Sequence, residues 1–221
     1  MSYPMHDTPY STAAETMIRD AHCFYEHGWL LGTSGNLSVR LDDTNFLITA
    51  SGRDKGRLTP DDFLAREIAR PGERGANSSA YPTDPSLKPS AEECIHQAIY
   101  ARVPGVGAVY HVHEPYSAFC SERDANLGST RMSSAEMIKG LGIWEANPRV
   151  RIPIFANHAD VPAIAAEVDA HLSDPANHKI PGVNIRNHGY YAWGSTPFEA
   201  KRHVETFAYL FRYSWELGNG A

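Results

Sequence analysis

Two histidines, His111 and His113, are separated by a single residue in an apolar segment at residues 109–114. The β-branched and aromatic residues of this segment predict a short buried strand. Because side chains alternate between the two faces of a strand, both imidazoles project from the same face, about 6.6 Å apart along the chain. Two imidazoles placed in this way can bind one metal ion, but two histidines that form hydrogen bonds at a strand end explain the pair equally well.

A third histidine, His188, follows another apolar segment and precedes Gly189. Three neutral imidazoles with an open fourth position form the ligand set of a catalytic zinc site. The third histidine therefore favours a metal site over isolated hydrogen-bonded rings. His96 and His203 fall in helical patterns, where we expect packing or surface roles.

Glu92, Glu93 and Glu136 are the carboxylates that we considered for acid–base chemistry. Glu93 is the third residue of a predicted helix that starts at Ser90, so helix capping explains it. For Glu92, a place at the helix start and a functional role are equally good explanations. Glu136 lies in a polar stretch with no helix start to cap, and a solvated helix face is the default explanation there.

Two loops rich in glycine and hydroxyl residues precede or follow predicted strands, at residues 34–36 and 51–55. Small residues with exposed amides suit a phosphate group, and a lysine can add charge. Each loop alone is also ordinary turn chemistry. Together with a serine at a helix N-terminus they predict an anion-binding site. The candidate ligands are Ser34, Gly35, Asn36, Ser51, Gly52, Lys55 and Ser90.

Helical patterns alternate with pairs of apolar strands along the chain. We expect helices at residues 12–27, 90–102, 115–120, 133–140, 161–172 and from 196 onward. We expect strands at residues 37–41, 46–48, 63–68, 109–114 and 150–155, and two strands or a strand and turn at 183–193. Residues 71–87 read as a surface loop without chemistry. The hairpin at 37–48 predicts a mixed or antiparallel central sheet, with helices on both faces.

The chain has 221 residues, of which 42% are apolar and 21% charged, with a formal net charge of -6. This length predicts a single domain over residues 1–221. The acidic balance argues against a nucleic-acid partner. No segment approaches the roughly 18 apolar residues of a membrane span, and the N-terminus lacks the regions of a signal peptide. Three cysteines without metal-type spacing complete the prediction of a cytoplasmic protein with reduced thiols.

These motifs together resemble the class II aldolase and adducin superfamily. The matching segments extend over nearly the whole chain in register, at residues 33–38, 49–52, 89–92, 111–113 and 187–189. The resemblance implies a three-layer α/β/α sandwich around a mostly antiparallel sheet. It also implies a homotetramer with sites near subunit interfaces, a phosphorylated ketose substrate, and one zinc ion per subunit on His111, His113 and His188.

Within the superfamily, the likeness is greatest to a group of dehydratases. It rests on the segments at residues 51–56, 136–145, 151–154, 157–160 and 185–189. This likeness implies zinc-dependent dehydration of 5-methylthioribulose 1-phosphate to 2,3-diketo-5-methylthiopentyl 1-phosphate, a step of methionine salvage. Aromatic candidates for contact with the methylthio group are Trp144, Tyr209 and Tyr213.

The two glutamates separate this function from its alternatives. Glu136 matches the acid–base glutamate of the dehydratases, and Glu92 matches that of the sugar-phosphate aldolases. The aldolases usually have serine where this chain has Ala91, and the dehydratases often have glutamine where it has Ala135. An aldolase or 4-epimerase that acts on fuculose or ribulose phosphate is the first alternative. A non-catalytic interaction module, as in adducin heads, is the second.

Overall fold

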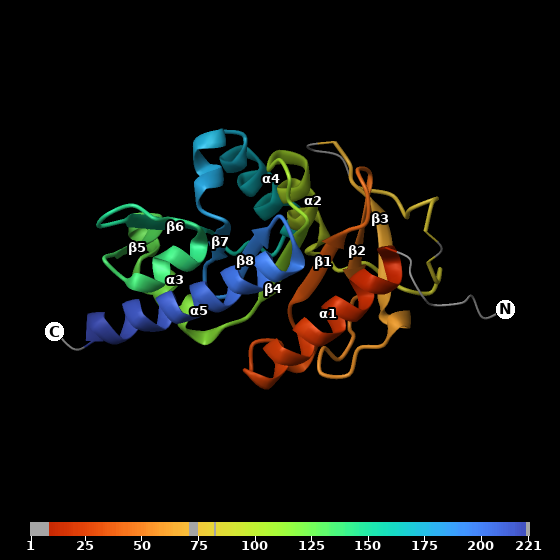
Figure 1. Ribbon diagram of the computed structural model, residues 1–221, viewed down its shortest axis with the longest axis horizontal. Coiled ribbons are helices and arrows are strands. Elements are labelled where there is room, and N and C mark those ends of the chain that lie inside the picture. Colours follow the sequence, from red (N-terminus) through yellow and green to blue (C-terminus); the bar gives the residue numbers. More distant parts are fainter. Residues whose placement is uncertain (1–8, 71–74, 82, 220–221) are drawn as a thin grey trace.

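A single sheet of eight strands organises the computed structural model, which describes residues 9–70, 75–81 and 83–219 (Figure 1). The strand order is β3-β2-β1-β4-β8-β7-β6-β5. Only β6 and β7 pair in parallel among the described strands, and all other neighbours are antiparallel. The strands are β1 (Asn36–Arg40), β2 (Asn45–Thr49), β3 (Phe63–Glu67), β4 (Ala108–Val112), β5 (Ser129–Ser133), β6 (Arg149–Phe155), β7 (Gly182–Ile185) and β8 (Gly189–Gly194).

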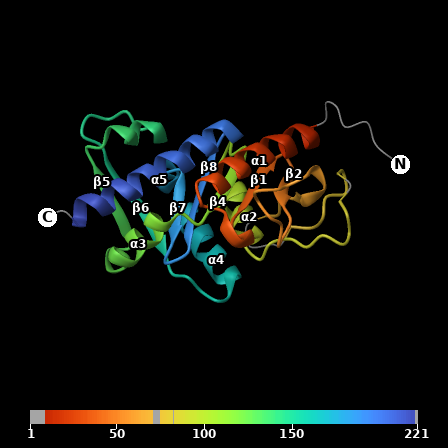
Figure 2. The same ribbon diagram turned by 90° about the horizontal axis from the view of Figure 1, so that it is seen from below.

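Helices cover both faces of this sheet. Figure 2 shows α1 and α5 along one face, with α2 and α4 on the opposite face. The helices are α1 (Pro9–Glu26), α2 (Glu93–Arg102), α3 (Pro115–Arg123), α4 (Val161–Leu172) and α5 (Pro197–Asn219), and η4 (Glu136–Leu141) is a 3-10 helix. The predicted α/β architecture with a mostly antiparallel sheet is therefore confirmed.

Side-chain alternation along β4 determines which core each residue enters. Tyr110 and Val112 pack into the core that α1 and α5 cover, whereas Val109 packs into the core under α2 and α4. His111 lies between Tyr110 and Val112, so its ring points to the side of α2 and α4. The direction of the His111 ring is thus fixed by the register of a buried strand.

Several boundaries differ from the sequence-based expectations. α1 already includes Pro9, so Thr12 lies inside the helix and not at its start. α2 begins at Glu93, and the expected side-chain cap by this glutamate is wrong: its carboxylate lies 2.9 Å from Nε of Arg66. The partly buried guanidinium of Arg66 offers the carboxylate a charged partner, which a helix-end amide does not.

Some of the sequence-based predictions fall on residues 1–8, 71–74, 82 and 220–221, which lie outside the described residues. They include the N-terminal segment that we compared with signal peptides and part of the loop at residues 71–87. No helix in the described part of the chain is both long enough and apolar enough to cross a membrane.

Candidate active site

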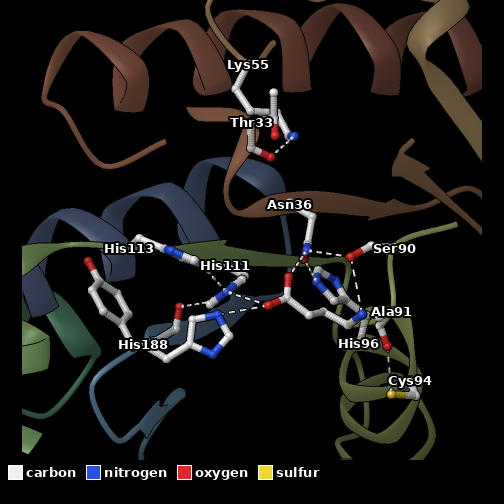
Figure 3. Close-up of polar contacts among 12 residues, drawn as sticks. Thr33, Asn36, Lys55, Ser90, Ala91, Cys94, His96, His111, His113 and His188 are labelled. Atoms are coloured by element: carbon white, nitrogen blue, oxygen red, sulfur yellow. Dashed lines mark hydrogen bonds and ion pairs between the residues drawn. The ribbon is translucent and has the colours of Figure 1, made fainter. Parts of the chain in front are cut away.

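The three histidines predicted to bind metal meet at one end of β4 (Figure 3). His111 is in β4, His113 follows that strand, and His188 lies in the turn between β7 and β8. Because β8 pairs with β4, the turn before β8 lies beside the end of β4. Nε2 of His113 lies 3.0 Å from Nε2 of His111, and the ring centroids of His113 and His188 are 4.5 Å apart.

Glu92 is the fourth member of this cluster. One ligand atom from each of the four residues lies within 4.8 Å of the others. Oε1 of Glu92 lies 2.9 Å from Nε2 of His188 and 3.6 Å from Nε2 of His111. Burial alone would raise the pKa of Glu92, but the neighbouring imidazoles outweigh it and hold the pKa well below its usual range. The site therefore contains a carboxylate beside three imidazoles.

The hydrogen bonding of His111 fits a metal ligand. Its Nδ1 lies 3.0 Å from the carbonyl oxygen of Tyr190, which can only accept a hydrogen bond. Nδ1 therefore carries a proton, and Nε2 is the nitrogen that faces the cluster and would bind the metal. The ring is fully buried and stacks on Tyr191 with the centroids 4.1 Å apart.

The surroundings of His113 and His188 fit a metal ion as well. Burial, followed by the neighbouring rings, lowers the pKa of His113 to about 3, so this ring is neutral. Nδ1 of His188 is buried without a hydrogen-bond partner among the described residues. The ligand atoms of the three imidazoles and the carboxylate are close enough to surround a single cation. The donor set of three imidazoles and one carboxylate suits a divalent ion such as zinc.

Asn36 and Ser90, both predicted phosphate ligands, lie against Glu92. Asn36 is opposite His111 in the pairing of β1 with β4, and its Nδ2 donates to Oε2 of Glu92 at 2.6 Å. The same amide donates to Oγ of Ser90 at 3.3 Å, and the backbone N–H of Glu92 donates to that oxygen at 3.2 Å. These two residues thus hold the carboxylate of the cluster.

Lys55 connects the two predicted phosphate loops. Lys55 is 2% exposed, and its Nζ donates to the carbonyl oxygen of Thr33 at 3.1 Å (Figure 3). Nζ also donates to the carbonyl oxygen of Arg53 at 2.9 Å. Burial lowers the pKa of Lys55 to about 8. The backbone N–H of Ser51 donates to the carbonyl of Lys88, just before the segment that carries Ser90. The three predicted anion-binding segments are therefore adjacent.

The remaining predicted phosphate residues differ in exposure and in how close they lie to the histidines. Ser51 and Gly52 are exposed in their turn, and Ser34 is half-buried. Gly35 has a φ of +67°, and a Cβ there would lie 2.7 Å from the carbonyl oxygen of His111. Only glycine allows this loop to approach the histidine strand so closely.

The structure does not bring Glu136 into the cluster. Glu136 starts η4, its side chain is 82% exposed, and Oε1 accepts a hydrogen bond from Nζ of Lys139 at 2.6 Å. The aromatic candidates also lie outside the four-residue cluster: Trp144 is 74% exposed, and Tyr209 stacks on Tyr213 along α5.

Residues that support the cluster from outside were not predicted from the sequence. The turn of His188 is held by Glu122, whose carboxylate accepts two hydrogen bonds from Arg186 at 2.7 and 2.8 Å and one from Asn187 at 2.6 Å. His96 was expected to have a packing or surface role, but its ring forms a hydrogen bond with Asn36. No local pattern marks these residues, because their partners lie on distant segments.

Comparison with known proteins agrees with this geometry. Residues 15–215 match the model of the family described as Class II Aldolase and Adducin N-terminal domain. The chain is 41% identical over 198 residues to the methylthioribulose-1-phosphate dehydratase of Microcystis aeruginosa, with 90% of this chain and 92% of that protein covered. It is 43% identical over 188 residues to the protein of the same name from Geobacillus kaustophilus, with 84% and 82% covered.

Solved structures show the same fold. L-fuculose-1-phosphate aldolase from Thermus thermophilus matches with a TM-score of 0.70 at 23% identity, covering 96% of this chain and 99% of that one. The curated relatives, at 38 to 43% identity, confirm the prediction of an enzyme of the lyase class. The superfamily resemblance found in the sequence is confirmed too: this chain belongs to the class II aldolase and adducin family.

Proposed function

We propose that the protein catalyses the zinc-dependent dehydration of 5-methylthioribulose 1-phosphate to 2,3-diketo-5-methylthiopentyl 1-phosphate. The observation that carries this proposal is the convergence of His111, His113 and His188 beside the ionised Glu92, in a chain about 40% identical to dehydratases with that name. We further propose one zinc ion per subunit, a homotetramer, and a place in methionine salvage in the cytoplasm.

The three imidazoles would hold the ion through nitrogen lone pairs. A zinc ion bound there supplies a Lewis acid that polarises the carbonyl of a ketose. The reaction removes a proton from C3 and hydroxide from C4 of the sugar. A carboxylate within reach of both atoms can accept the first proton and return one to the leaving hydroxyl, which is general acid–base catalysis.

We propose that Glu136 is the acid–base residue. Glu92 would stabilise the metal-binding cluster through its contacts with the histidines. η4 fixes the position of Glu136, because Ile138 and Leu141 of this 3-10 helix are buried. Because Glu136 lies outside the cluster of its own chain, it would act on the site of a neighbouring subunit. This arrangement agrees with the family resemblance, which implies sites near subunit interfaces.

We propose that the three adjacent segments around Ser34, Ser51 and Ser90 bind the phosphate group. Lys55 has no ion pair with a carboxylate in the described part of the chain, so its charge is available to an anion. A phosphate fixed there would set which carbon atoms face the histidines.

The position of Glu92 favours one second candidate function. Glu92 matches the glutamate of the sugar-phosphate aldolases, and it is the carboxylate that touches the histidines. An aldolase acting on a sugar phosphate of the fuculose or ribulose type would use the same cluster with Glu92 as the acid–base residue.

The deciding experiment is turnover by the purified protein, before and after removal of metal with a chelator and after zinc is returned. We expect dehydration of 5-methylthioribulose 1-phosphate that is lost and regained with the metal, and no cleavage of fuculose 1-phosphate. Cleavage of fuculose 1-phosphate without dehydration would establish the aldolase function instead.

Two matched variants assign the glutamates. Glu136→Gln should retain zinc and lose dehydration by about 10²-fold or more, as expected for general acid–base catalysis. Mixed assembly of Glu136→Gln chains with His113→Ala chains should restore part of the turnover, because some sites then combine intact halves. If Glu136→Gln stays active while Glu92→Gln loses turnover, Glu92 is the acid–base residue.

A further inference from the structure

A buried row of polar side chains extends from Glu92 into the core between the sheet and α2. It consists of Asn36, His96, Ser38 and Tyr100, none of which is more than 5% exposed. Figure 3 shows Asn36 and His96 beside the cluster, on the side away from His113. These residues come from β1 and α2.

Each contact in this row is within hydrogen-bond distance. Nδ2 of Asn36 lies 2.6 Å from Oε2 of Glu92, and Oδ1 of Asn36 lies 2.5 Å from Nε2 of His96. On the other side of the ring, Nδ1 of His96 lies 2.7 Å from Oγ of Ser38. That oxygen lies 2.9 Å from the hydroxyl of Tyr100.

The direction of every hydrogen bond follows from the carboxylate at one end. A carboxylate only accepts, so Asn36 must turn its NH2 group toward Glu92 and its oxygen toward His96. The oxygen in turn requires a proton on Nε2 of His96. The ring is neutral because it is fully buried, so its Nδ1 must accept a hydrogen bond. The Ser38 hydroxyl therefore donates to Nδ1 at 2.7 Å in preference to the carbonyl oxygen of Val109 at 3.3 Å, and Ser38 accepts from Tyr100. All donors in the row point toward Glu92.

We propose that His96 is a positioning residue, which locks the Asn36 amide so that its NH2 group holds Glu92 against His111 and His188. An asparagine amide can rotate by half a turn with little change of shape. The Nε2–H of His96 prevents this rotation, because the rotated amide would present its own NH2 group to that N–H. The rotated amide would also place an oxygen against the oxygen of Glu92.

This inference rests on the proposed function only in treating the cluster as the metal site. The relevant variants differ in which ring nitrogen they replace. In His96→Gln, the amide nitrogen occupies the place of Nε2 and still donates to Asn36. In His96→Asn, the shorter amide occupies the place of Nδ1 and cannot reach Asn36. His203 is a second buried histidine, which bonds to the carbonyl of Trp193, so His203→Asn controls for loss of a buried ring.

The experiment measures zinc affinity by competition with a coloured chelator, together with kcat on the proposed substrate. We expect His96→Asn to lower both by about 10-fold to 100-fold, as other supporting residues of metal sites do. His96→Gln should restore both toward the wild-type values, and His203→Asn should change neither. Equal zinc affinity in the Gln and Asn variants would overturn the proposal.

A second measurement uses the wild-type protein and does not depend on variants that fold. Nitrogen-15 NMR of the imidazole groups in the metal-free protein should show His96 with its proton on Nε2. A proton on Nδ1 would overturn the proposal. If the protein binds zinc but does not dehydrate the sugar phosphate, the proposed function fails while these two tests still decide the role of His96.

Discussion

The buried ammonium of Lys55 offers the sharpest test of how the site is built. Lys55→Met removes the charge and keeps most of the length of the side chain. In the wild type, Nζ donates to two backbone carbonyls, and no carboxylate forms an ion pair with it among the described residues. The folded state therefore holds a desolvated positive charge that the unfolded chain exposes to water.

The cost of that charge follows from its pKa. Burial lowers the pKa of Lys55 from 10.5 to about 8, a difference that corresponds to about 3 kcal/mol of unfolding free energy. Between pH 8 and 10.5 the unfolded chain holds more protons than the folded protein, so the stability of the wild type rises with pH in this window. Below pH 8 the full penalty applies, and above 10.5 it is absent.

Urea unfolding of both proteins across this window measures the effect. The unfolding free energy of Lys55→Met minus that of the wild type should fall by about 3 kcal/mol as the pH rises, because every other titrating group cancels. Lys179→Met, which removes an exposed lysine paired with Glu145, should follow the wild type. A constant difference between Lys55→Met and the wild type would refute the reasoning. Inorganic phosphate should stabilise the wild type more than the variant if Lys55 serves the anion site.

Three further predictions concern the support of the cluster. Glu122→Gln should loosen the turn of His188 and lower zinc affinity by about 10-fold, measured by chelator competition. Gly189→Ala should lower the unfolding free energy by about 3 kcal/mol in urea, because overpacking forces the strands apart; its Cβ would lie 2.2 Å from the carbonyl oxygen of Val112. In the metal-free protein, burial lowers the pKa of His96 from 6.5 to about 3, so the stability present above pH 6.5 is lost as the pH falls toward 3. An acid-unfolding series should show a shallower loss in His96→Gln.

Matched controls separate these effects from general damage. Glu145→Gln breaks an exposed ion pair away from the histidines and should leave zinc affinity unchanged. Gly105→Ala places a Cβ in open space at a φ of +75°, so it should cost only about 1 kcal/mol. If a variant and its control lose zinc affinity or unfolding free energy to a similar extent, the close contacts of Glu122 and Gly189 do not govern the site.

Local sequence patterns were enough to predict most of the elements. The hairpin of β1 and β2 and the strand of His111 follow apolar alternation and turn residues that lie within a few positions. Around His188 the pattern left two strands or a strand and turn open, and the structure has two strands. The same patterns could not give the parallel pairing of β6 with β7. That pairing depends on the path of α4 and on packing between distant segments.

The candidate site, too, could be predicted from the sequence only in part. The spacing of His111 and His113 sufficed to put both rings on one face, and His188 could be added because it follows a strand. Glu92 joined them only in the folded chain, because α2 must pack beside β1 and β4 for its carboxylate to arrive. His96 could not be found from a helical pattern, since a packed histidine and a positioning histidine have the same periodicity.

The central claim is that three imidazoles from two distant segments hold one metal ion. Zinc titration combined with X-ray absorption spectroscopy of the loaded protein tests it directly. We expect one zinc per chain, with three imidazole nitrogens at about 2.0–2.1 Å, and loss of that signal in His188→Ala. A zinc ion with fewer than three imidazoles, or an unchanged spectrum in His188→Ala, would contradict it.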